Sequence, residues 1–241
     1  MARPTNEELF DTPMAEFPAA SRALYRVAIA VLTAISRLMW RWRVEDAEKL
    51  LPAPGAKTGS VIICNHTSMA EVVAIVCHLV RSGRHVRAVG KAEFFENKLV
   101  AWAFTRAGAF PVRRGASDMK ALRHASHALQ RGEDLLIFPE GTRIRTDDQP
   151  VEVHGGFALI AQMAKAPVAP LAVCGFRDIT PAGKKLMRPK KCWLRAGEPL
   201  SLADAPSELK RRERLAWLER EGMRRVYELR DALRAEHPGR F

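Results

Sequence analysis

Cysteine is scarce in this sequence and does not occur in pairs. The 241 residues include four cysteines, and no two of them have the CxxC spacing of a zinc site. Internal repeats and low-complexity tracts are also absent, so the chain is most simply one domain with its own core. The cysteines lie in apolar runs, which excludes a disulfide framework and predicts reduced core residues of a cytoplasmic protein: Cys64, Cys77, Cys174 and Cys192.

Long hydrophobic runs are missing as well. No apolar core follows a basic start, so the sequence predicts no signal peptide. The longest uncharged run, Val27 to Ser36, is too short to span a bilayer. Residues 1–18 contain three prolines and mixed charge, and we expect them to form a loose N-terminal arm.

Residues 19–43 nevertheless have the periodicity of an amphipathic helix. Apolar side chains recur every three or four positions on one stripe, and four arginines lie on the opposite side. At a membrane surface such arginines meet lipid phosphates while the apolar stripe enters the acyl boundary. A helix packed on the core of the domain is the alternative, and both hold if the helix bridges domain and membrane. The stripe comprises Leu24, Ala28, Val31, Ile35, Leu38 and Trp42, and the arginines are Arg22, Arg26, Arg37 and Arg41.

The charge balance is strongly basic, and tyrosine is rare. A formal net charge of +12 and a pI near 10.1 predict an anionic partner: nucleic acid, anionic lipid, a phosphate substrate or an acidic carrier protein. Only two tyrosines are present, and no compact basic stripe is interleaved with aromatic residues, which argues against nucleic acid. A non-catalytic basic protein remains the alternative, and its signature would be DNA binding with a steep salt dependence.

Short apolar runs alternate with helical patterns along most of the chain. Strands are predicted at 43–45, 61–64, 85–89, 108–112, 135–138, 168–174 and, as an edge strand, 192–195; helices are predicted between Ser68 and Gly83 and at 91–107, 117–130, 156–165 and 206–235. This alternation predicts an α/β fold. We expect a single domain with a mixed, largely parallel central sheet flanked by helices, plus the N-terminal amphipathic helix.

Three segments follow from this pattern. Residues 1–43 are expected to form the arm and a membrane-surface helix, and residues 44–200 the α/β domain. Residues 201–241 are expected to form a charged helix packed on that domain.

The turn after the strand at 61–64 carries a histidine in a chemically favourable place. Ser68 is the expected helix N-cap, and Glu71 follows three residues later, as a capping box requires. His66 therefore lies between the carboxyl end of a strand and the amino end of a helix, where open α/β sheets bind ligands. The partial positive charge of the helix end favours a neutral imidazole, which can accept a proton. Glu71 either orients His66, like the acid of a Ser-His-Asp triad, or only caps its helix.

Two further polar clusters follow buried strands. Arg113 and Arg114 come after the strand at 108–112, and the run Glu140-Gly141-Thr142-Arg143 comes after the strand at 135–138. Because the carboxyl ends of parallel strands share one edge of a sheet, these clusters and His66 are expected to converge. Arginine forks suit a phosphate, and Gly141 allows backbone N–H groups to approach an anion. Each cluster alone is also ordinary turn chemistry, so the joint occurrence carries the argument.

A protein nucleophile is not indicated. The sequence contains no GxSxG motif, which argues against a serine hydrolase. Cys64 stands two residues before His66, but it belongs to an apolar run with no neighbouring charge to form a thiolate. The nucleophile is therefore expected to be a hydroxyl of the substrate.

Taken together, four blocks resemble the glycerolipid acyltransferases, the family of 1-acylglycerol-3-phosphate acyltransferases (PlsC-like). Asn65 to Glu71 resembles the NHxSxxD block, with Glu71 in place of the usual Asp. Phe110 to Gly115 looks like the second block, whose arginine aligns with Arg114. Phe138 to Arg143 is similar to the FPEGTR block without a substitution, and Ala166 to Ala172 resembles the fourth, proline-bearing block. The flanks 1–43 and 200–241 are not matched in this way.

The resemblance implies transfer of a fatty acyl chain from acyl-CoA or acyl carrier protein to the free sn-2 hydroxyl of 1-acylglycerol-3-phosphate, giving phosphatidic acid. It implies His66 as general base and Glu71 as the acid that orients it. It also implies that no metal and no tightly bound cofactor is needed. The enzyme would work at the cytoplasmic face of the cell membrane, as a peripheral or monotopic protein. The implied substrate-binding residues are Arg113, Arg114, Glu140, Gly141, Thr142 and Arg143.

The acceptor is left open by the departure at Glu71. Its side chain is one methylene longer than that of the usual Asp, so the same chemistry on another lysolipid or a glycolipid is the alternative.

Overall fold

A seven-stranded sheet forms the centre of the protein in a computed structural model that describes residues 4–112, 118–180 and 186–241. The strands are β1 (Arg43–Glu45), β2 (Val61–Cys64), β3 (Val86–Lys91), β4 (Phe110–Val112), β5 (Asp134–Ile137), β6 (Val168–Cys174) and β7 (Trp193–Ala196). Their order is β1-β7-β6-β2-β5-β3-β4, and only the β6–β7 pair is antiparallel. The predicted mixed, largely parallel sheet is therefore confirmed.

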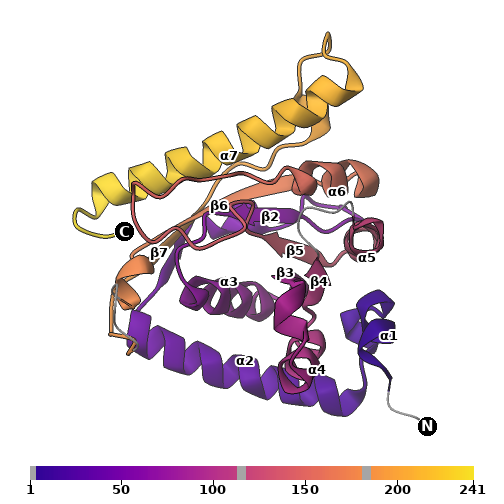
Figure 1. The fold of residues 1–241 in the computed structure, drawn as a ribbon, viewed down its shortest axis with the longest axis vertical. Helices are drawn as coiled ribbons and strands as arrows, with labels where there is room; N and C mark the ends of the chain where they lie inside the picture. Colours follow the sequence, from indigo (N-terminus) through magenta and orange to yellow (C-terminus); the bar gives the residue numbers. More distant parts are fainter. Residues whose placement is uncertain (1–3, 113–117, 181–185) are drawn as a thin grey trace.

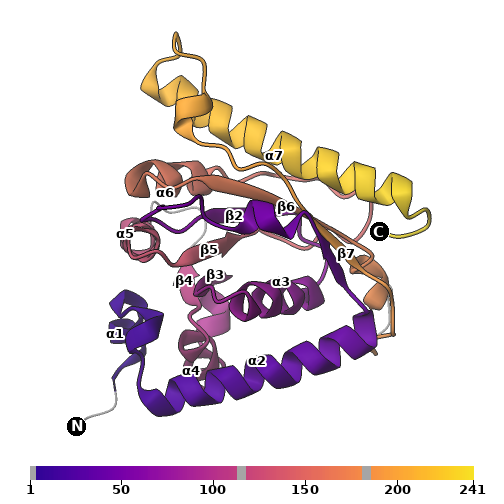
Figure 2. The same ribbon diagram turned by 180° about the vertical axis from the view of Figure 1, so that it is seen from behind.

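Helices cover both faces of the sheet, as Figures 1 and 2 show. On one face lie α2 (Ala19–Trp40) and α3 (Met69–Arg81), and on the other lie α5 (Met119–Gln130), α6 (Gly156–Ala164) and α7 (Arg211–Glu236). The side chains of strand β2 are buried on both faces of the sheet. Val61 and Ile63 belong to the core under α5, α6 and α7, and Ile62 and Cys64 belong to the core under α3. Alternate side chains of a strand point to opposite faces, so an unbroken apolar run is buried on both.

The N-terminal segment is not the loose arm that its prolines predicted. Residues Asn6–Asp11 form the short helix α1, which is closed by a capping box between Thr5 and Glu8. Leu9, Met14 and Phe17 are buried in a small cluster of their own. The sequence contains the signals for this structure, a Thr with Glu three residues later, but the docking itself depends on distant residues.

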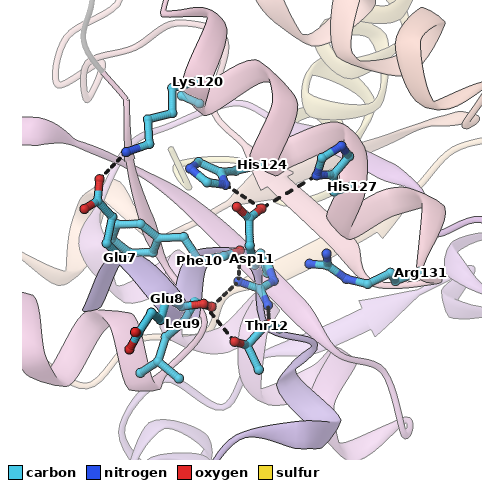
Figure 3. Close-up of polar contacts among 12 residues, drawn as sticks. Glu7, Glu8, Leu9, Phe10, Asp11, Thr12, Lys120, His124, His127 and Arg131 are labelled. Atoms are coloured by element: carbon cyan, nitrogen blue, oxygen red, sulfur yellow. Dashed lines mark hydrogen bonds and ion pairs between the residues drawn. The ribbon is translucent and has the colours of Figure 1, made fainter. Parts of the chain in front are cut away.

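Ion pairs fasten α1 to α5, as Figure 3 shows. The Asp11 carboxylate lies 2.6 Å from Nδ1 of His124 and 3.7 Å from Nδ1 of His127, and Lys120 pairs with Glu7. Burial opposes ionisation of Asp11, but the hydrogen bonds and charges of His124 and His127 lower its pKa overall.

A buried arginine anchors the chain after α1. Arg87, on β3, is 1% exposed, and its guanidinium pairs with Glu133 at 2.7 Å. Glu133 also accepts the backbone N–H of Met14 at 2.6 Å. The remaining guanidinium N–H groups donate to backbone carbonyls at the end of α1, those of Leu9, Phe10 and Thr12. A buried charge with every donor occupied explains why this segment is ordered.

The predicted helix at 91–107 is shorter than expected. The strand β3 runs on to Lys91 because residues 89–91 pair with β4, and a 3-10 turn at Ala92–Phe95 follows. The helix α4 (Lys98–Arg106) begins only after Asn97, whose side chain accepts the N–H groups of Leu99 and Val100. Similarly, α5 is capped by Asp118; the predicted cap, Ser117, lies outside the described residues.

The predicted edge strand at 192–195 is an internal strand. It is β7, which pairs with β6 on one side and with β1 on the other. The edge is β1, a three-residue strand held by an Arg195–Glu45 hydrogen bond of 2.7 Å between side chains. Very short edge strands offer little unpaired backbone for association with another chain.

The helix α2 packs on the domain with the face opposite to the predicted stripe. Its buried side consists of Ile29, Thr33, Ser36 and Trp40. The two hydroxyls of that side are satisfied, because Thr33 Oγ1 donates to the carbonyl of Ile29 at 2.6 Å and Ser36 Oγ accepts from the Trp42 indole at 3.1 Å.

The predicted apolar stripe of α2 is largely uncovered. Leu24, Val31, Ile35 and Leu38 are 51% to 80% exposed, whereas Trp42, just beyond the helix, is buried. By length and composition alone this 22-residue helix can cross a membrane, which the short uncharged run within it did not indicate.

Candidate active site

The turn after β2 is held in place by the side chain of Asn65. Its amide extends the ladder between β2 and β6 by one step, accepting the N–H of Val173 at 2.9 Å and donating to the carbonyl of Val173 at 3.2 Å. Asn65 is 2% exposed, so these bonds form away from water. The end of β2 is therefore tied to β6, and His66, which follows Asn65, is placed at the rim of the sheet.

His66 and Glu71 are in direct contact. Nδ1 of His66 lies 2.6 Å from Oε1 of Glu71, and the carboxylate is fully buried. Because an ionised carboxylate can only accept, Nδ1 carries the imidazole proton and Nε2 is left with a free lone pair. The geometry therefore gives His66 the tautomer that a general base needs.

The carboxylate of Glu71 also caps α3. Its Oε1 accepts the N–H of Thr67 at 2.6 Å, and its Oε2 accepts the Thr67 hydroxyl at 2.6 Å and the Ser68 N–H at 2.9 Å. The Ser68 hydroxyl in turn accepts the N–H of Ala70, which completes the capping box. The two interpretations of Glu71 are thus compatible: one carboxylate contacts the histidine ring and caps the helix.

A second buried carboxylate holds the backbone of His66. Oε2 of Glu140 accepts the N–H of His66 at 2.7 Å, and Glu140 is 4% exposed. Burial raises the pKa of Glu140, while the His66 N–H works in the opposite direction. His66 is therefore held at its ring by Glu71 and at its main chain by Glu140.

The segment after β5 wraps around His66. The ring of Phe138 stacks on the imidazole with centroids 4.3 Å apart and planes at 29°. The backbone then turns at Gly141, which has a φ of 62°, and the N–H of Ile144 donates to the carbonyl of His66 at 2.7 Å. A positive φ is a conformation that glycine adopts without steric cost. Thr142 and Arg143 lie between these two attachments to His66.

The predicted substrate-binding residue Arg143 lies in this same turn. Its side chain is half-buried, and no carboxylate in the described part of the chain forms an ion pair with its guanidinium. Thr142 is exposed, and its backbone N–H donates to the carbonyl of Glu140 at 2.6 Å. The other two predicted arginines, Arg113 and Arg114, lie outside the described residues; β4, which they follow, ends at the same rim of the sheet as β2 and β5.

Cys64 is not a nucleophile in this arrangement. The thiol is fully buried, and burial followed by the charges of Glu71 and Glu140 raises its pKa well above the ordinary value. Within the described ranges, no group of three or more His, Cys, Asp or Glu side chains could hold a metal ion. The neutral imidazole of His66 is the described group at this rim whose chemistry is suited to proton transfer.

The structure brings together most of the predicted site and adds residues that sequence reasoning missed. His66, Glu71 and Glu140 are joined by hydrogen bonds, and Gly141, Thr142 and Arg143 share one turn beside them. Asn65 and Phe138 lie in the predicted blocks, but sequence reasoning assigned them no role. Their roles depend on contacts with Val173 and His66, which are distant in sequence.

A model of the acyltransferase family matches residues 41–174, which is more than half of the chain and includes every block described above. This chain belongs to the acyltransferase family. The acyltransferase is 32% identical to the 1-acyl-sn-glycerol-3-phosphate acyltransferase of Bacillus subtilis over 210 residues, covering 87% of this chain and 98% of that protein. It is an O-acyltransferase, and the family resemblance inferred from its blocks is confirmed.

Two further comparisons bear on the fold and on the acceptor. The acyltransferase is 27% identical over 164 residues to a lyso-ornithine lipid O-acyltransferase of Pseudomonas aeruginosa, covering 65% of this chain and 61% of that protein. Its fold is similar to that of the crystal structure of PlsC from Thermotoga maritima, a 1-acyl-sn-glycerophosphate acyltransferase. That match has a TM-score of 0.61 at 20% identity and covers 86% of this chain and 82% of the other.

Proposed function

We propose that this acyltransferase transfers a fatty acyl chain from acyl-CoA or acyl carrier protein to the sn-2 hydroxyl of 1-acylglycerol-3-phosphate, giving phosphatidic acid. The observation that carries the proposal is the 2.6 Å contact between Nδ1 of His66 and the buried Glu71. The Bacillus subtilis relative named for this activity, similar over almost its whole length, supports the choice of acceptor.

In the proposed reaction His66 is the general base. Its Nε2 takes the proton of the acceptor hydroxyl as that oxygen bonds to the thioester carbonyl carbon. The carbon–sulfur bond then breaks, and the thiolate leaves with the proton that the imidazolium returns. The products are an ester and a free thiol, and His66 is neutral again. A positioned base contributes about 10²–10⁴-fold, so alignment of the two substrates supplies much of the remaining acceleration.

The acceptor phosphate is proposed to bind at the arginines of the rim. Arg143 is the described member of this set, with a guanidinium that has no internal carboxylate partner among the described residues. Arg113 and Arg114 are proposed as its companions, and Gly141 and Thr142 as backbone that approaches the phosphate. A guanidinium fork matches phosphate oxygens in pairs, which also orients the adjacent hydroxyl toward His66.

The proposed location is the cytoplasmic face of the cell membrane, with the protein lying on the surface. The uncovered apolar stripe of α2 continues onto the neighbouring helix α4, where Leu99 is 75% and Trp102 is 41% exposed. Figures 1 and 2 show the two helices at the same end of the molecule. Since the other side of α2 packs on the domain through Ile29, Thr33, Ser36 and Trp40, α2 is proposed to lie in the plane of the interface.

Another lysolipid acceptor is the second candidate. The resemblance to a lyso-ornithine lipid O-acyltransferase and the presence of Glu71 in place of the usual Asp both favour it. The two candidates share the chemistry at His66 and differ in the group that the arginines hold.

An acceptor panel separates them. Purified enzyme with palmitoyl-CoA is given lysophosphatidic acid, lyso-ornithine lipid or lysophosphatidylglycerol, and the lipid product is identified by mass spectrometry. The proposal predicts phosphatidic acid as the favoured product, with a kcat/KM at least about tenfold above that for the other acceptors, because only this acceptor carries a terminal phosphate. Preferred acylation of lyso-ornithine lipid would establish the second candidate instead.

A further inference from the structure

The C-terminal helix α7 passes directly behind the catalytic turn, although it lies outside the residues that the family model matches. At Gly222 the helix is so close to β2 that an added Cβ would lie 3.0 Å from Cδ1 of Ile63. Val226, one turn further on, is fully buried in the same core as Ile63. The next residue of the helix, Tyr227, is thereby fixed near the rim where β2 and β5 end.

The hydroxyl of Tyr227 is buried, and the Glu140 carboxylate is among the groups that it interacts with. It has no partner of full hydrogen-bond geometry in the described part of the chain, which is costly for a buried polar atom. Burial raises the pKa of the Tyr227 phenol, and the charge of Glu140 raises it further. The outer side of the ring is covered by the guanidinium of Arg230, 4.6 Å from the ring centroid.

Glu140 has one carboxylate oxygen to offer. Its Oε2 accepts the N–H of His66, and no donor of standard hydrogen-bond geometry contacts Oε1 among the described residues. The charged and titratable groups that face this carboxylate are Cys64 at the end of β2, His66 in the turn after it, Glu71 in the first turn of α3, and Tyr227 on α7. Tyr227 is the group among them that carries a neutral O–H donor.

We propose that Tyr227 is a positioning residue of the acyltransferase, whose hydroxyl supports the ionised Glu140 that in turn holds the main chain of His66. The inference rests on the proposed role of His66. It makes α7 part of the active site and explains why a helix outside the family blocks is packed so tightly against β2. A hydrogen bond from a phenol to a carboxylate favours the ionised acid. Without it, Glu140 would be protonated at a higher pH and would hold His66 less firmly.

The first test is spectroscopic and independent of catalysis. The chain contains only two tyrosines, so Tyr25→Phe leaves Tyr227 as the single tyrosine. With tyrosine labelled with ¹³C at Cζ, one NMR signal then reports its hydroxyl. The proposal predicts that Glu140→Gln, in the Tyr25→Phe background, shifts this signal in a protein that keeps its melting temperature. An unchanged signal would mean that the two side chains do not interact, and the proposal would be overturned.

The second test is kinetic, with Tyr25→Phe as the matched control. Tyr25 on α2 also has a buried hydroxyl without a partner among the described residues, but it is not near Glu140. For Tyr227→Phe we expect kcat to fall by about 3–10-fold with both KM values unchanged, since the proposed support of the Glu140 carboxylate by the hydroxyl is lost. We also expect the acid limb of the kcat–pH profile to move up by roughly one pH unit. Tyr25→Phe should change neither.

Two outcomes separate this inference from the proposed function. If Tyr227→Phe has the kcat and pH profile of Tyr25→Phe while His66→Ala is inactive, Tyr227 has no positioning role and the general-base assignment stands. If His66→Ala keeps its activity, the proposed role of His66 fails, and with it the catalytic meaning of the Tyr227–Glu140 contact, which the NMR signal still tests as a contact.

Discussion

At the scale of single residues, the site depends on one carboxylate that makes four contacts. Glu71 accepts hydrogen bonds from the His66 ring, from the N–H and hydroxyl of Thr67 and from the N–H of Ser68. These donors occupy both oxygens of a carboxylate that is fully buried, as a buried polar group requires. They explain how a glutamate replaces the usual aspartate: its longer chain curls back along the helix N-terminus to reach the ring.

This arrangement predicts different results for two substitutions at position 71. Glu71→Gln is expected to lower kcat by about 10²-fold or more, because an amide cannot accept all four hydrogen bonds and no longer fixes the tautomer of His66. Glu71→Asp is expected to stay within about tenfold of the natural enzyme, since the charge is kept and only the reach is shortened. Steady-state kinetics with saturating donor and acceptor measure both.

The control for lost helix capping is Asn97→Ala. It removes the cap of α4, which costs about 1 kcal/mol of stability without touching His66. If Glu71→Gln were no less active than Asn97→Ala, Glu71 would be a cap alone.

The residue scale also shows where sequence reasoning succeeds and where it stops. The contact between His66 and Glu71 is predictable because it is local: a strand end, an N-cap and a spacing of five residues place both groups in one turn. The burial of Arg87 is not predictable, because an arginine on a strand is ordinarily solvated. Here it is enclosed by Glu133 and by a segment some 75 residues earlier in the chain. Tyr227 reaches the site through tertiary packing, for which the local pattern contains no signal.

At the scale of elements, periodicity finds a helix but not the face that packs. The apolar stripe of α2 was identified from its spacing, yet the side that contacts the domain includes Thr33 and Ser36, whose hydroxyls are satisfied within the protein. Non-local pairing explains the other differences. Residues 89–91 are strand because β4 pairs with them, and β7 is internal because β1 pairs with its outer side. No property of those segments alone contains this information.

The exposed stripe of α2 makes a prediction about membrane binding. Val31→Asp/Ile35→Asp is expected to reduce co-sedimentation with phosphatidylglycerol vesicles by at least about tenfold, because two charges would have to enter the acyl boundary. The folded domain should be unaffected, since both side chains already face solvent. The thermal unfolding temperature in detergent checks this.

The matched control introduces the same charges elsewhere. Ala203→Asp/Ser207→Asp places two carboxylates at exposed positions near the start of α7, on the opposite face of the sheet from α2. It changes net charge equally and should leave binding close to that of the natural protein. Equal loss in both variants would show that charge alone, and not the stripe on α2, governs attachment.

At the scale of the whole molecule, two properties follow from composition and order of elements. The alternation of strands and helices fixes an α/β fold and places strand ends of the same sense along one rim, which is why three separate blocks were expected to meet. Two of them do so in the described residues, around His66 and around Glu140. The net charge of +12 favours binding to an anionic surface. The exposed apolar residues of α2 and α4 indicate which side of the protein would contact that surface.

The docked N-terminus shows the limit of reasoning from composition at this scale. Three prolines and mixed charge are compatible with a loose segment. The buried pair of Arg87 and Glu133, the ion pairs to α5 and the small apolar cluster together make an ordered one favourable. The segment leads directly into α2, so its attachment to the domain also fixes the position of the first turn of that helix.

The most direct test of the account is thiol release from palmitoyl-CoA, with and without lysophosphatidic acid, for the natural enzyme and for His66→Ala. We expect release that requires the acceptor and that falls by about 10²–10⁴-fold in His66→Ala, since the variant loses its base but keeps the sites for both substrates. Acceptor-dependent release that survives in His66→Ala at a comparable rate would contradict the assignment of His66 as the base.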